Sequence, residues 1–137
     1  MLEKLPLIGI IDDDKIYQFM LTRLIKNNML SERIVTFMDG EKAIQYLSEN
    51  KADTKNIPDI IFLDINMPIM DGWQFLEEYA NIKAELKKKI VIIMLSSSVN
   101  PIDVERANKI TEIADYIVKP IKSEELKRVF DSLETFL

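Results

Sequence analysis

The chain has 137 residues, the usual length of one domain, and its 47% hydrophobic and 30% charged residues are typical of a globular fold. It contains no cysteine and no histidine, which excludes a disulfide, a thiolate metal site, a Ser-His-Asp triad and a phosphohistidine within this chain. The formal charge of −5 argues against non-specific nucleic-acid binding, which depends on basic patches.

Short apolar runs alternate with longer amphipathic stretches along the whole chain. Most of the runs are rich in Ile or Val, as buried parallel strands are. They lie at Leu7–Ile11, Ile34–Met38, Ile60–Leu63, Ile90–Leu95 and Tyr116–Val118. Five strand–helix units in this order predict an α/β fold with a parallel sheet covered on both faces. Right-handed crossovers make that sheet doubly wound.

Four stretches between and after these runs show the spacing of apolar residues on one face of a helix. Their apolar positions are Ile16, Met20 and Leu24; Ala43, Ile44 and Leu47; Leu76, Tyr79 and Ala80; and Leu126, Val129, Phe130, Leu133 and Leu137. Turn signals precede two of the helices, at Asp39-Gly40 and Asp71-Gly72. Pro101 after Asn100, and Ser123 before two glutamates, indicate two further helix starts.

Polar side chains follow four of the five predicted strands. They are Asp12-Asp13-Asp14, Asp64, Ser96-Ser97-Ser98 and Lys119-Pro120. Because the carboxyl ends of parallel strands meet at one edge of the sheet, where such sheets bind ligands, we expect these groups to converge.

Three of the expected neighbours are carboxylates, Asp12, Asp13 and Asp64. Like charges at short range repel, and a divalent cation with hard oxygen ligands, such as Mg²⁺, would relieve the repulsion. The alternative for the acidic run is that it caps the next helix. Asp14, beside Lys15, is expected to be that cap.

Asp64 follows a fully apolar strand, so it is either a structural hydrogen-bond acceptor or a reactive group. A carboxylate can attack phosphorus and form an acyl phosphate, provided that cations neutralise the transferring group. Lys119 can supply an ammonium and Ser96 a hydroxyl. Taken singly, a lysine after a strand is usually solvated and a run of serines is usually a loop, but together at one edge they indicate a phosphoryl-transfer site.

Four stretches of the sequence resemble the receiver domain of two-component response regulators. They are Ile10–Asp14, Leu63–Gly72, Met94–Ser98 and Ala114–Pro120. They occur in the family's order and spacing over nearly the whole chain. The resemblance implies a (βα)5 flavodoxin-like fold with strand order 2-1-3-4-5 and a single receiver domain over residues 1–137.

The same resemblance implies roles for the residues of the site. Asp64 would be the phosphoacceptor, Asp13 would bind Mg²⁺ directly with help from Asp12, and Asp64 and the backbone carbonyl of Asn66 would complete the protein's ligands. Lys119 would pair with the phosphoryl group.

A second set of implied roles concerns switching and decay. Ser96 would be the switch hydroxyl, and Tyr116 the aromatic ring that changes rotamer with it. The Lys119–Pro120 bond would be cis. Asn66 and Ser98 would flank the water that hydrolyses the acyl phosphate, and since neither is a strong base we expect a lifetime of minutes.

The resemblance also implies partners. The phosphoryl group would come from a histidine kinase or phosphotransfer protein, and a downstream protein would bind the face formed by the fourth helix, fifth strand and fifth helix. Only 17 residues follow Pro120, so we expect no output domain, and the alternative is that the sequence is a fragment of a larger regulator or hybrid kinase. A monomer or weak dimer is expected. The chain is not expected to be an enzyme, and it would assist only its own phosphorylation and dephosphorylation.

Neither a membrane nor nucleic acid is an expected partner. The sequence lacks both a signal-peptide pattern and an apolar run of roughly 20 residues, so a cytoplasmic location is expected.

Two alternatives belong to other functional classes. Haloacid-dehalogenase-like phosphohydrolases use a similar set of groups, but carry a second aspartate two residues after the nucleophile, where this chain has Asn66. A pseudo-receiver would bind partners without being phosphorylated, although no member of the expected site is missing.

Overall fold

The computed structural model describes residues 5–136, with side chains described to residue 133. It contains one five-stranded parallel sheet with the order β2-β1-β3-β4-β5, which confirms the predicted fold class and strand order. The strands are β1 (Leu7–Ile11), β2 (Arg33–Phe37), β3 (Ile60–Leu63), β4 (Val91–Ser96) and β5 (Ile113–Val118).

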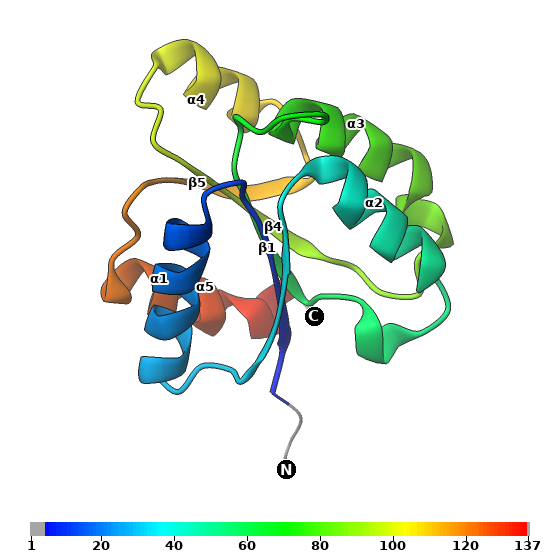
Figure 1. The fold of residues 1–137 in the computed structure, drawn as a ribbon, viewed down its shortest axis with the longest axis horizontal. Coiled ribbons are helices and arrows are strands. Elements are labelled where there is room, and N and C mark those ends of the chain that lie inside the picture. The colour runs from blue at the N-terminus through cyan, green and yellow to red at the C-terminus, as the bar shows by residue number, and fades with distance from the viewer. Residues whose placement is uncertain (1–4, 137) are drawn as a thin grey trace.

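An α-helix follows each strand, so the chain is a (βα)5 unit. The helices are α1 (Lys15–Asn27), α2 (Gly40–Glu49), α3 (Gly72–Ile82), α4 (Pro101–Asn108) and α5 (Ser123–Phe136), with short 3-10 helices η1 (Thr54–Asn56) and η2 (Lys83–Glu85). Helices α1 and α5 lie on one side of the sheet, and α2 and α3 lie on the other (Figure 1). Within the described residues, no helix has both the length and the apolar composition that crossing a bilayer requires.

The central strands are buried on both faces, and their side chains alternate between two apolar clusters. Ile60 and Phe62 of β3 pack with residues of α1 and α5. Ile61 and Leu63 pack with residues of α2, α3 and α4. This explains why the sequence reads as unbroken apolar runs, with no polar alternation.

The predicted strand boundaries were right within one residue except at β5, which begins at Ile113 and not at Tyr116. This strand pairs with β4 at one edge of the sheet, and it includes the half-buried Asp115. An edge strand tolerates polar residues, so its first half has no apolar signature.

The predicted apolar face of α1 was wrong in phase. Leu21 and Ile25 are the buried residues of this helix, whereas Ile16 is 72% exposed and Met20 53% exposed. Leu24 does pack against the core, but beside Leu21 and Ile25. The spacing of apolar residues could not identify the buried face of α1, because the helix carries apolar residues on two faces.

On the remaining helices most of the predicted apolar positions face the core. Ala80 of α3 is an exception and is exposed. The prediction for Leu137 lies outside the described residues.

The helix starts follow the predicted signals. Asp14, Asp39 and Asp71 are N-caps whose carboxylates accept backbone N–H groups, and Asn100 caps α4 ahead of Pro101. Helix α5 begins at Ser123 itself.

Gly72, the first residue of α3, has a steric role. A Cβ atom there would lie 2.5 Å from the backbone oxygen of Asp64, and the Gly72 N–H donates to the Ile65 oxygen at 2.7 Å. Only glycine allows this approach, which folds the loop after β3 back against the strand end.

Candidate functional site

The predicted site residues do converge at the carboxyl ends of β1, β3 and β5. Ile11 and Leu63 are paired in the sheet, so the residues that follow them, Asp12 and Asp64, leave neighbouring strands side by side. One carboxylate oxygen from each of Asp12, Asp13 and Asp64 lies within 4.8 Å of the others.

Both carboxylate oxygens of Asp12 have partners. Oδ1 accepts the N–H of Asp14 at 2.9 Å, and Oδ2 accepts from Nζ of Lys119 at 2.7 Å. The residue is only 3% exposed, whereas the neighbouring Asp13 is exposed. Asp12 is thus fixed in place, and Asp13 is the carboxylate most open to an incoming ion.

Asp64 is 8% exposed and less completely paired. Its Oδ1 accepts the N–H of Ile65 at 2.9 Å, and its Oδ2 lies 3.7 Å from Nζ of Lys119. Burial, and then the charge of Asp12, raise the pKa of Asp64 to about 6, against the lowering effect of Lys119. The carboxylate is therefore destabilised by its surroundings, and added positive charge would favour its ionised form.

Lys119 is the cation between these carboxylates. Burial lowers the pKa of Lys119, but the hydrogen bond to Asp12 and the charge of Asp64 outweigh it, so the pKa lies above its ordinary value. The backbone N–H of Lys119 donates to the Ser96 oxygen at 2.8 Å, and the Lys119–Pro120 bond is cis, as expected.

The two residues expected to switch, Ser96 and Tyr116, both contact the loop between β4 and α4. Ser96 is fully buried, and its hydroxyl oxygen accepts the N–H of Ser98 at 3.1 Å. The Tyr116 hydroxyl donates to the Ser98 carbonyl at 2.9 Å. The tyrosine of β5 is therefore tied to the loop that follows Ser96.

Asn66 and Ser98, the two residues expected to influence hydrolysis, differ in their surroundings. Asn66 is exposed in the loop after Asp64. The Ser98 hydroxyl donates to Asp103 of α4 at 2.7 Å and accepts the N–H of Asn100 at 3.2 Å. Ser98 thus links its loop to α4, a contact that the sequence did not indicate.

Sequence reasoning also missed two residues of α1. Gln18 donates to the backbone oxygens of Asp12 at 2.6 Å and Phe37 at 3.1 Å, which holds the ends of β1 and β2 together. The ring of Tyr17 lies under the Lys119 ammonium, with Nζ 4.3 Å from its centroid. A search for polar groups one turn after the Asp14 cap would have identified Gln18.

The donor set fits a hard divalent cation. Mg²⁺ takes oxygen ligands and usually one or two carboxylates, and here Asp12, Asp13 and Asp64 offer three. Asp13 and Asp64 each have a carboxylate oxygen available to bind the ion. Because Asp12 and Asp64 are buried, the ion would displace little water from them.

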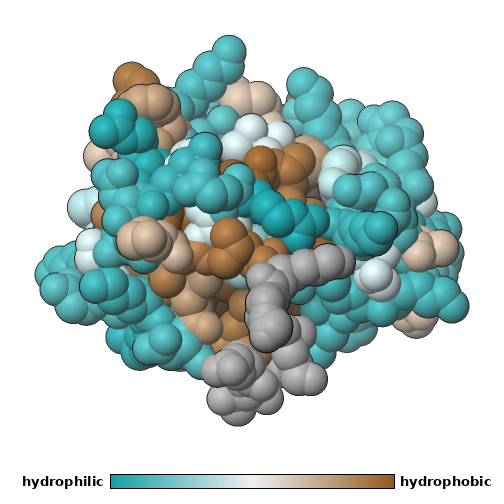
Figure 2. Space-filling model, turned by 90° about the horizontal axis from the view of Figure 1, so that it is seen from below, coloured by the Kyte–Doolittle hydropathy of each residue, from teal (hydrophilic) through white to brown (hydrophobic). Residues whose placement is uncertain are grey.

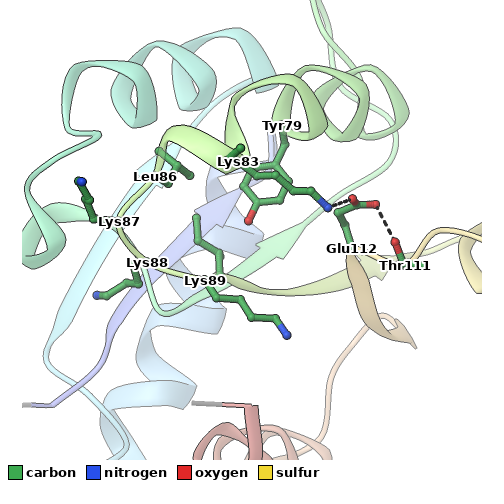
Figure 3. A pocket seen from close by; sticks show the side chains of 10 residues that line it. Tyr79, Lys83, Leu86, Lys87, Lys88, Lys89, Thr111 and Glu112 are labelled. Carbon is green, nitrogen blue, oxygen red and sulfur yellow. Dashed lines mark hydrogen bonds and ion pairs between the residues drawn. The ribbon is translucent and has the colours of Figure 1, made fainter.

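A cavity of about 680 Å³ lies elsewhere, lined by residues from α3, η2, the segment before β4 and the segment before β5. Lysines surround it, but Lys83 already bonds to Glu112 (Figure 3), and Lys88 to Asp59. This cavity is at the opposite ends of the strands from the aspartates and is not part of the acidic site.

Residues 8–131 match the family model described as response regulator receiver domain, so the chain belongs to this family. A two-component response regulator from Cytophaga hutchinsonii is similar in structure, with a TM-score of 0.88 and 30% identity over 97% of this chain and 99% of that one. Receiver domains bind Mg²⁺ in an acidic pocket, and the cluster of Asp12, Asp13 and Asp64 could hold a metal ion.

Two relatives differ in how much of their length the chain covers. The probable methanogenesis regulatory protein FilR2 of Methanothrix harundinacea (strain 6Ac) is 24% identical over 95% of this chain and 82% of its own length. The two-component response regulator ARR12 of Arabidopsis thaliana is 32% identical over 88% of this chain, but the match spans 18% of ARR12. The similarity to ARR12 therefore concerns less than a fifth of that protein.

Proposed function

We propose that this chain is a phosphorylation-dependent switch that accepts a phosphoryl group on Asp64 from a histidine kinase or phosphotransfer protein. The single observation that carries the proposal is the surroundings of Asp64. It is a buried carboxylate beside two others, with the Lys119 ammonium 3.7 Å from its free oxygen. An aspartate that served only as a structural acceptor would not need this environment.

The transfer is a displacement at phosphorus. An Asp64 oxygen attacks the phosphorus of the donor's phosphohistidine, and the P–N bond breaks as the new P–O bond forms. The imidazole nitrogen leaves with the bonding electrons and takes up a proton. Hydrolysis later breaks the new P–O bond by attack of water, and returns the Asp64 carboxylate and inorganic phosphate.

The residues around Asp64 would divide the work. Lys119 can turn from Asp12 toward the phosphoryl oxygens, and Asp12, Asp13 and the Asn66 carbonyl would hold Mg²⁺. A bound Mg²⁺ supplies further neutralisation of the phosphoryl charge. The chain would assist only its own phosphorylation and dephosphorylation.

The switch would run through the loop after β4. Ser96 is buried and can give its hydroxyl hydrogen to a phosphoryl oxygen, which would pull on a loop already bonded to Tyr116 and Asp103. Phosphorylation would thus shift the equilibrium between two packing arrangements of α4 and Tyr116. The readout face would be that of α4, β5 and α5, where Ile102 is 72% exposed and Val118 40% exposed.

The donor protein would bind across α1. The apolar residues that this helix leaves outside the core, Ile16, Phe19 and Met20, are 72%, 61% and 53% exposed. They lie in its first half, next to the Asp14 cap and therefore next to the acidic site. An exposed apolar group of this kind is characteristic of a protein-binding surface.

Intact mass measurement tests the proposal. The protein is incubated with Mg²⁺ and a small phosphodonor such as phosphoramidate, and we expect one added phosphoryl group. Asp64→Asn should take up none. A wild-type protein that remains unmodified while a known receiver domain is modified in parallel would refute the proposal in favour of a pseudo-receiver.

A further inference from the structure

The Lys119 ammonium lies against two acids and an aromatic ring. Nζ lies 2.7 Å from Asp12, 3.7 Å from Asp64, and 4.3 Å from the centroid of the Tyr17 ring. The Lys119 side chain is 15% exposed. A lysine has four rotatable side-chain bonds, so the carboxylates alone would not confine its ammonium to one place.

Hydrogen bonds hold both the backbone and the side-chain hydroxyl of Tyr17. Its backbone N–H donates to the Asp14 carboxylate at 3.2 Å, in the cap of α1. Its hydroxyl oxygen accepts the N–H of Ile121 at 3.4 Å, two residues after Lys119. The ring therefore bridges the first turn of α1 and the loop after β5, which are separated by more than 100 residues of sequence.

Packing is the simplest role for this ring, because Tyr17 is half-buried and contacts the cluster between the sheet and helices α1 and α5. Packing alone does not explain why the face of the Tyr17 ring lies against the Lys119 ammonium. An aromatic face attracts a cation, and the attraction is stronger where water is scarce. Here the face lies against the ammonium that contacts both Asp12 and Asp64.

We propose that Tyr17 is a positioning residue that holds the Lys119 ammonium between Asp12 and Asp64, ready for an incoming phosphoryl group. This inference rests on the proposed function, since it is Asp64 phosphorylation that Lys119 would assist. The ring face limits how far the ammonium can swing outward. Lys119 then passes from Asp12 to a phosphoryl oxygen by a short movement.

Two substitutions separate the ring from the hydroxyl. Tyr17→Phe keeps the ring face and removes the hydroxyl, whereas Tyr17→Leu keeps an apolar side chain and removes the ring. With phosphoramidate and Mg²⁺, we expect Tyr17→Phe to be phosphorylated within about twofold of the wild-type rate, and Tyr17→Leu roughly three- to tenfold more slowly. Tyr46→Leu is the matched control, because Tyr46 is a half-buried tyrosine that packs on Phe37 and should leave the rate unchanged.

A spectroscopic readout in the metal-free protein tests the contact without any phosphorylation. The ring should shift the NMR signals of the Lys119 ε-methylene protons upfield in wild type and in Tyr17→Phe. The shift should disappear in Tyr17→Leu and persist in Tyr46→Leu. An unchanged Lys119 signal in a folded Tyr17→Leu variant overturns the inference, whatever the wild-type protein does with phosphodonors.

A double substitution separates positioning from packing. If Tyr17 acts through Lys119, then Tyr17→Leu should slow phosphorylation no further in a Lys119→Ala background. A loss of equal size in both backgrounds would assign the effect to packing and overturn the proposal. If the wild type takes up no phosphoryl group, the proposed function fails and the role of Tyr17 in it fails too, while the NMR result still decides whether the contact exists.

Discussion

At the amino ends of the strands, three ion pairs between described residues each join one lysine to one carboxylate. The pairs are Lys51 with Glu85, Lys83 with Glu112 and Lys88 with Asp59. Seen from that side, apolar side chains lie near the centre of the surface and hydrophilic ones surround them (Figure 2). At the carboxyl ends, Asp12, Asp13 and Asp64 gather around Lys119.

The comparison shows ion pairs of one lysine with one carboxylate at one edge of the sheet, and three carboxylates around a single lysine at the other. Ion pairs at a partly exposed surface contribute little to the stability of the fold, and such a pair needs no further partner. Three carboxylates within 4.8 Å of one another repel, which lowers the stability of the fold. A bound cation would relieve this repulsion and could in turn neutralise a phosphoryl group. Under the proposed function, the carboxyl ends of the strands are the reactive edge of the sheet and the amino ends are the inert edge.

The largest expected contrast is in phosphorylation. Asp64→Asn keeps the shape of the side chain but removes the nucleophilic oxygen, so uptake from phosphoramidate should fall to background. Asp59→Asn, at the opposite edge, should be phosphorylated at the wild-type rate. Intact mass spectra of both variants decide this, and phosphate on Asp64→Asn would contradict the assignment of the nucleophile.

Stability should respond in opposite directions at the two edges. The pKa of Asp64 rises from 3.8 to about 6 on folding, so between these values the folded protein binds a proton that the unfolded chain has released. Stability is therefore lost as the pH rises through this window. Asp64→Asn should raise the free energy of unfolding at pH 7, without metal, by about 1–3 kcal/mol.

The matched substitution is Asp59→Asn, which weakens the ion pair with Lys88 at 3.0 Å. We expect it to lower stability by about 1 kcal/mol at pH 7. Urea unfolding at pH 7 and pH 4.5 measures both variants. A gain for Asp64→Asn that is as large at pH 4.5 as at pH 7 would show that burial and repulsion of the ionised carboxylate are not its source.

A metal should remove the excess charge at the reactive edge. Millimolar Mg²⁺ should raise the melting temperature of the wild type by roughly 2–5 °C, because it binds only the folded site. Asp13→Ala should abolish this rise, and Glu112→Gln at the inert edge should keep it. Equal protection of wild type and Asp13→Ala in thermal melts would mean that Asp13 is not a ligand.

The smallest expected effect concerns the lifetime of the phosphoryl group. Ser98→Arg should slow its loss about two- to fivefold by crowding the attacking water. Ser97→Arg is the control, because Ser97 is the exposed neighbour in the same loop. Decay is followed by mass after the donor is removed. Equal effects of both arginines, or no effect of either, would mean that Ser98 does not border the path of the attacking water.

The sequence predicted the strand ends well, for a physical reason. Buried parallel strands appear as apolar runs, and the first polar residue after each run must lie at the carboxyl edge of the sheet. Asp12, Asp64 and Lys119 could therefore be placed together on the pattern of apolar and polar residues alone. The cis bond before Pro120 and the strand order came from the resemblance to a family.

Side-chain contacts between distant segments could not be predicted in this way. Tyr17 meets Ile121 across more than 100 residues, and neither residue carries a local pattern that indicates the other. The phase of α1 was also wrong, since the helix has apolar residues both toward the core and toward solvent. The outward-facing ones, Ile16 and Met20, are those that we now assign to docking.

Borohydride trapping tests the central claim most directly. Hydride reduces the acyl carbonyl of an aspartyl phosphate and releases phosphate, so the modified residue becomes homoserine. After reaction with phosphoramidate and Mg²⁺, reduction and proteolysis, we predict homoserine at position 64 and unchanged aspartate at 12, 13 and 59. Homoserine at any of those three positions, or at none in a protein that has gained phosphate, would contradict the account.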